Sequence, residues 1–183
     1  MDTAFDAALL LTALAGQAGD RVDLICVDRI PHLSVIGSTR TKVLHDMVTA
    51  TAAIEPALVE TDWELAANTI AQRARRGALV VLLTPVEASV VHTGLLPVAA
   101  RLAKDHPLVV ASVADPALGQ LATGRGDTEA VYQAAAAEQA RSEKAGVAHA
   151  LERVGAHVVD APPERAPQAL ADAYLALKAA GRL

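Results

Sequence analysis

The chain has 183 residues, of which 52% are hydrophobic and 20% are charged, and its formal net charge is −5. A chain of this length suits one domain and can bury roughly 70% of the surface that its unfolded form exposes. Only 2% of the residues are aromatic and Lys and Arg form no dense cluster, so we expect no nucleic-acid partner, because such binding needs clustered basic charge and stacking surfaces.

The first part of the chain predicts helices around a small hairpin. Residues 3–17 are apolar on nearly every side, which is typical of a buried helix. Residues 21–28 predict a strand, and Pro31 introduces a short return strand over 33–36, antiparallel to the first and at the sheet edge. The two helices that follow are predicted over 41–54 and 61–76.

From residue 78 onward, buried strands alternate with helices. The run 78–84 is apolar throughout, which is typical of a strand buried on both faces of a parallel sheet. The predicted strands lie near 79–84, 107–114 and 156–160, and the predicted helices near 93–105, 127–154 and 165–180. We therefore predict an α/β fold with an open, mostly parallel, doubly wound sheet of about five strands and one antiparallel edge strand.

Two further features lie between the last strands. Residues 116–126 predict a short helix and a glycine-rich turn, and the Arg125-Gly126-Asp127 tripeptide is interpreted as that turn followed by a helix cap. The helix over 127–154 would be close to ~40 Å long at ~1.5 Å per residue. This is longer than a crossover on the sheet requires, so we expect part of it to protrude.

The sequence contains none of the common catalytic motifs. It has no G-x-S-x-G, no phosphate-binding glycine loop, no H-E-x-x-H and no paired cysteines, and its six histidines lack ligand spacing. Cys26 is the only cysteine and lies within an apolar run, which indicates a buried thiol in a reduced cytoplasmic protein. Asp2 and Asp6 stand where a signal peptide carries positive charge, and no run approaches the ~18 apolar residues of a membrane span.

Polar residues at the strand ends are the remaining candidates, because ligands of open α/β sheets collect at the carboxyl ends of the strands. The strand-end residues are Asp28, Thr84, Asp115 and Asp160. Thr61-Asp62 opens the next helix in the loop before the third strand, and Thr61 with Glu64 matches the capping box T-x-x-E. Asp115 is interpreted first as part of a helix-entry turn. The alternative is a small hydrolase or nucleotide-binding enzyme that uses Thr84 and Asp115.

Several segments resemble one bacterial family. GAHVVDAP at 155–162, YLALKAAGRL at 174–183 and ADPAL at 114–118 are similar to segments of domain-of-unknown-function family fifty-eight. Its von Willebrand factor type A-like proteins are associated with MoxR-type AAA+ ATPases, and its members often carry membrane anchors. The resemblance implies one such domain over 1–183, incomplete at its N-terminus, that acts as a non-enzymatic protein-interaction module with an AAA+ ATPase as partner.

The resemblance also implies a metal site that this chain does not complete. The family pattern uses a DxSxS motif on the first central strand, a loop threonine, and an aspartate after a later strand. Thr61 matches the threonine, but Pro85 stands where the aspartate is expected and DxSxS is absent. A hard divalent cation needs several oxygen ligands. We therefore expect no metal and no cofactor, and only a degenerate binding surface at Thr61, Asp62 and Thr84.

In the family's strand order, the absent first strand would lie between the strands at 22–27 and 79–84. Each unpaired backbone group costs about 1–3 kcal/mol if it stays buried. We therefore expect these two strands to close up and pair directly, giving one contiguous five-stranded sheet. A homodimer in which a second copy covers the gap is the alternative.

Overall fold

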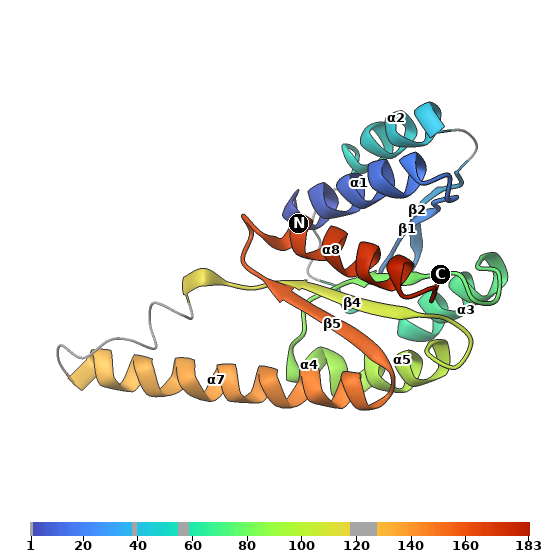
Figure 1. Ribbon diagram of the computed structural model, residues 1–183. Coiled ribbons are helices and arrows are strands. Elements are labelled where there is room, and N and C mark those ends of the chain that lie inside the picture. The colour runs from blue at the N-terminus through green and yellow to red at the C-terminus, as the bar shows by residue number, and fades with distance from the viewer. Residues whose placement is uncertain (1, 38–39, 55–58, 118–127) are drawn as a thin grey trace.

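The computed structural model describes residues 2–37, 40–54, 59–117 and 128–183. In this part of the chain, helices pack on both faces of a parallel sheet and a small hairpin lies apart from that sheet (Figure 1). The protein therefore has the predicted α/β fold. Most of the short helix and turn predicted over 116–126, and the whole Arg125-Gly126-Asp127 tripeptide, lie outside the described residues.

The elements follow the predicted order. They are α1 (Asp2–Gln17), β1 (Leu24–Val27), β2 (Pro31–Val35), α2 (Arg40–Thr51), α3 (Trp63–Arg73), β3 (Val80–Leu83), α4 (Ala88–Val90), the π-helix η1 (Val91–Leu95), α5 (Leu96–Leu102), β4 (Leu108–Val113), α7 (Thr128–Arg153), β5 (Ala156–Ala161) and α8 (Ala166–Ala179). The helix predicted over 93–105 begins earlier, at Ala88, and contains a π-helical turn.

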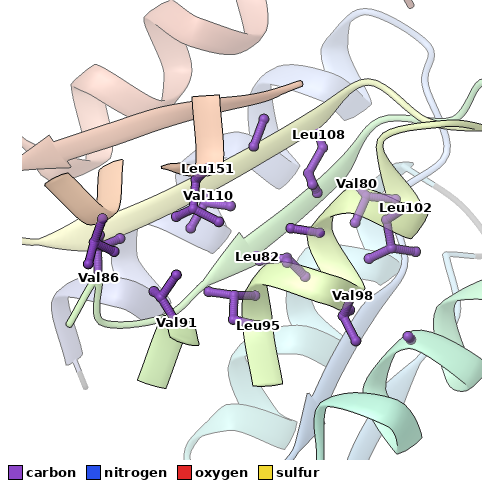
Figure 2. Close-up of a cluster of buried hydrophobic side chains, with 14 residues drawn as sticks. Val80, Leu82, Val86, Val91, Leu95, Val98, Leu102, Leu108, Val110 and Leu151 are labelled. Carbon is purple, nitrogen blue, oxygen red and sulfur yellow. The ribbon is translucent and has the colours of Figure 1, made fainter. Parts of the chain in front are cut away.

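β3, β4 and β5 form a three-stranded parallel sheet in that order. Val80 and Leu82 of β3 belong to a buried cluster with residues of η1, α5 and α7 (Figure 2). The alternate residues Val81 and Leu83 pack on the opposite face, in a cluster with residues of α1 and α8. The sheet is thus covered on both faces, which explains why its strands are continuous apolar runs.

The long helix α7 crosses the lower face of this sheet as drawn, and its N-terminal half extends past the sheet (Figure 1). Two of its residues in this half, Val131 and Tyr132, are 54% and 72% exposed. The expectation that part of this helix protrudes is therefore confirmed.

β1 and β2 form a separate two-stranded antiparallel sheet, in which Leu24 lies opposite Val35. The hairpin packs with α1 and α2 around Met47, which is fully buried. The segment after β2 approaches β1 so closely that a Cβ on Gly37 would lie 2.3 Å from the Val22 carbonyl oxygen, so only glycine fits there. The predicted antiparallel return strand is confirmed.

The predicted direct pairing of residues 22–27 with residues 79–84 is wrong. β1 pairs with β2 and β3 pairs with β4, and the two sheets share no ladder. The expectation treated the free backbone groups as buried, which makes them costly. All four residues of β1 are only partly buried, as are Val81 and Leu83. Water can therefore reach these edges, and solvated backbone groups do not require the strands to close.

The hairpin side of the molecule is held to the main sheet by contacts between α1 and α8. A polar cluster beside α1 strengthens this junction. The Asp20 carboxylate accepts hydrogen bonds from the Tyr174 hydroxyl at 2.6 Å and the Lys178 ammonium at 2.5 Å. The pKa of Asp20 is lowered, first by the hydrogen bond from Lys178 and then by that from Tyr174.

Tyr174→Phe is expected to lower the free energy of unfolding at pH 7 by about 1 kcal/mol, because it removes one hydrogen bond to a carboxylate. Since the folded-state pKa of Asp20 is lowered, its stabilisation is present above the unfolded pKa near 3.8 and is lost as the pH falls through the folded pKa. Urea titrations from pH 7 to pH 3 should show the difference shrinking in acid. Tyr132→Phe, on an exposed tyrosine, is the matched control, and an equal effect there would contradict this assignment.

Candidate functional site

A groove of about 2070 Å³ separates the two sheets. One wall is β1, the other is β3 with the carboxyl end of β4, and residues of α1, α3 and α8 also line it. Pockets for drug-sized ligands usually have volumes of roughly 300–1,000 Å³. The size and the two strand walls therefore indicate a site for an extended polypeptide rather than for a small molecule.

The β3 wall offers unpaired backbone groups. The Val80 N–H donates to Pro107 O and the Thr84 N–H donates to Ala111 O, so the alternate residues of β3 direct their groups toward β4. Because neighbouring residues of a strand direct their backbone groups to opposite sides, Val81 and Leu83 present theirs toward the groove. No strand in the described residues pairs with this edge of β3.

The β1 wall is apolar but incompletely covered. Its residues Leu24, Ile25, Cys26 and Val27 all line the groove, and none of them is fully buried. Burial raises the pKa of the Cys26 thiol, so this side chain is a neutral apolar contact at neutral pH.

Helices cover the groove from two sides. Trp63, Ala66 and Ile70 of α3 line it and pack toward the same cluster as Val80 and Leu82. On the other face, Phe5 of α1 and Leu170 of α8 line it. A strand placed beside β3 would thus be covered on both faces by apolar side chains.

The residues singled out from the sequence, Thr61, Asp62 and Thr84, all line this groove. Their local roles differ from the predicted capping box. The N-cap of α3 is Asp62, whose carboxylate accepts from the Leu65 N–H at 2.9 Å, and not Thr61. Glu64 pairs with Arg101 at 2.9 Å and does not reach back to the cap. The capping interpretation is therefore right for this helix start but was assigned to the wrong residue.

Three of the four strand-end residues, Asp28, Thr84 and Asp115, line the same groove. The Asp28 carboxylate accepts from the Ile30 N–H at 3.0 Å and contacts His32 at 2.7 Å, and these hydrogen bonds, the first being the larger, lower its pKa. Asp115 accepts from the Ala117 N–H at 2.9 Å, which confirms the predicted entry turn. The fourth residue, Asp160, pairs with Lys144 on α7 and does not line the groove.

The charges of the groove are arranged along α3. At the start of this helix, the Asp62 N–H donates to Asp28 O at 2.9 Å, which places Glu60, Asp62 and Asp28 together. At its end, Arg73 bonds to Ser34 of β2 and Arg75 precedes β3. α3 has 11 residues, so at ~1.5 Å per residue the acidic and basic ends lie roughly 16 Å apart.

The described residues contain no group of three or more His, Cys, Asp or Glu side chains placed to hold a metal ion. In the same part of the chain, no helix is both long enough and apolar enough to cross a bilayer. The open edge of β3 was not found from the sequence. The only signal for it was the both-faces-buried character of residues 79–84, which requires a neighbour on each side.

Fold and groove define an α/β protein with an open-edged parallel sheet. The model of one family, described as protein of unknown function DUF58, matches residues 1–128, so the chain belongs to this family, the domain-of-unknown-function family fifty-eight suggested by its sequence. No curated protein matches the chain, and no solved structure does.

Proposed function

We propose that this chain is a non-enzymatic protein-interaction module, and that its groove binds an extended segment of another protein by backbone pairing along β3. The observation that carries the proposal is the free edge at Val81 and Leu83, which faces a groove of about 2070 Å³. Adding a strand to an exposed sheet edge is a recurring mode of peptide recognition, in which main-chain hydrogen bonds supply affinity.

We further propose that the module is von Willebrand factor type A-like and works in the cytoplasm with a MoxR-type AAA+ ATPase in assembling or remodelling other proteins. Membership of the DUF58 family supports this part of the proposal through the association that the family resemblance implies. The groove fits such a role, because an extended segment is the form in which a remodelled client or a partner's tail is presented.

The test replaces one backbone donor. The Val81 N–H faces the groove and is not used in pairing with β4, so Val81→Pro removes a donor from the free edge without breaking the ladder. The probe is a fluorescent peptide of five valines between polyethylene glycol tails. Val81→Pro is expected to weaken its binding about tenfold, from the lost hydrogen bond and the ring's clash with the incoming strand.

Val81→Ala is the matched control, because it shortens the side chain but keeps the N–H. Circular dichroism should show that both variants retain the fold. Equal affinity of the proline and alanine variants for the valine peptide, measured by fluorescence anisotropy, would rule out pairing along β3.

A further inference from the structure

We propose that the segment bound in the groove is a run of about five aliphatic residues with a Lys or Arg at one end and an Asp or Glu at the other. The inference rests on the proposed function and specifies the chemistry of the partner. It follows from three properties of the groove: its cover, its length and its charge.

The cover requires aliphatic side chains at consecutive positions. Successive side chains of a strand point to opposite faces of the sheet. Beside β3, one face is closed by Trp63 and Ile70 of α3, and the other by Phe5 and Leu170. Side chains on both faces of the bound strand therefore meet apolar walls, and an alternating polar pattern would bury polar groups without partners.

The length follows from the helix that runs along the groove. α3 spans roughly 16 Å between its acidic and basic ends. A strand rises about 3.3 Å per residue, so about five residues extend over this distance. This is close to the lengths of β3, with 4 residues, and β4, with 6.

The charge requires opposite ends. Glu60 and Asp62, beside Asp28, lie at the start of α3, whereas Arg73 and Arg75 lie at its end. Asp62 and Arg73 are also placed as the helix dipole favours, but Glu60 and Arg75 lie outside the helix and extend the same polarity. Arg21 and Asp23, which also line the groove, pair with each other at 3.2 Å. A basic residue of the partner therefore fits the Glu60 end and an acidic residue fits the Arg75 end.

A second copy of this chain is a poorer occupant. The long apolar runs of this chain, within β3 and β4, are already paired in its own sheet. Offering one of them to a neighbour would require the donor to unfold its buried cluster. The observations therefore favour a segment from a different protein.

The test uses four peptides of five valines that differ only in their flanking residues. They carry Lys then Glu, Glu then Lys, two Lys, or two Glu, and their binding to the full chain is measured by fluorescence anisotropy at low salt. One of the two mixed peptides is expected to bind about fivefold more tightly than the other three, since exposed charge pairs contribute modestly. The preference should fade in ~1 M salt, where the Debye length is ~3 Å.

A double charge reversal, Glu60→Lys with Arg75→Glu, is expected to transfer the preference to the opposite mixed peptide. Asp172→Lys with Arg182→Glu makes the same charge changes at exposed positions outside the groove and should leave the preference unchanged. The transfer of preference between mirror-image peptides is a readout that a merely destabilised variant would not give.

The outcomes separate the two proposals. If all four peptides bind equally and binding remains sensitive to Val81→Pro, the charge pattern is wrong while strand pairing stands. If no valine peptide binds, both proposals are overturned. A concentration-dependent dimer in sedimentation velocity that the peptides fail to dissociate would show that a second copy occupies the groove, and would overturn this inference.

Discussion

Gly94→Ala is expected to lower the free energy of unfolding by about 1–2 kcal/mol, although alanine is the better helix former. A Cβ built on Gly94 would lie 2.5 Å from Cδ1 and 3.2 Å from Cγ of Trp63. Gly94 lies within the π-helical turn η1, and Trp63 begins α3. The added methyl group must therefore push α3 away from η1 or force the indole out of its position.

Gly146→Ala is the matched control, because Gly146 lies in α7 and a Cβ there would meet nothing within 4 Å. This substitution should stabilise the protein by about 0.5–1 kcal/mol through the lower backbone entropy of the unfolded chain. Guanidinium denaturation of both variants gives the comparison.

Trp63→Leu should remove most of the penalty of Gly94→Ala, giving a coupling free energy in a double-mutant cycle. If Gly94→Ala is stabilising like Gly146→Ala, the close packing of Trp63 on η1 is wrong. Because Trp63 also lines the groove, displacing it should change peptide binding as well.

The elements of the main sheet were predictable because their local signals are strong. Val80–Leu83 and Leu108–Val113 are uninterrupted apolar runs, and each is buried on both faces by helices that follow in the chain. The start of the helix at Ala88 was missed. Pro85 precedes it, and the residues that fix its position, Val91 and Leu95, do so through burial against the sheet.

The cap of α3 shows a second limit. Thr61 and Asp62 are adjacent and both residue types cap helices well, so the spacing to Glu64 favoured the threonine. In the structure Glu64 pairs with Arg101, which is 37 residues away in the chain. A tertiary ion pair thus decided which residue caps the helix, and the local pattern contained no sign of it.

The relation between β1 and β3 was the largest error, and composition alone does not determine it. Both strands are apolar, and their sequences permit direct pairing or separation. What separates them is the docking of α1 on α8 and of α2 on the hairpin, which gives the hairpin a core of its own. The residues predicted as a weak binding surface, Thr61, Asp62 and Thr84, nevertheless line the resulting groove.

Met47→Ala is expected to loosen the hairpin side of the groove selectively. Met47 is fully buried between the hairpin and its helices, and its sulfur accepts a hydrogen bond from the Thr12 hydroxyl at 3.2 Å. Truncating a buried methionine costs about 2–5 kcal/mol. If the hairpin opens separately from the main sheet, as its separate cluster suggests, this cost should appear as amide exchange at least about thirtyfold faster in β1, β2 and α2.

Leu151→Ala is the matched comparison, because Leu151 is equally buried but packs in the cluster beneath the main sheet. It should accelerate exchange in β3, β4 and β5 by a similar factor. Uniform acceleration across both sheets in the Met47 variant would show that the two sheets open as one cooperative unit. Selective acceleration would instead mean that the β1 wall moves independently of β3, so that the groove can adjust its width to an incoming strand while the pairing edge of β3 stays fixed.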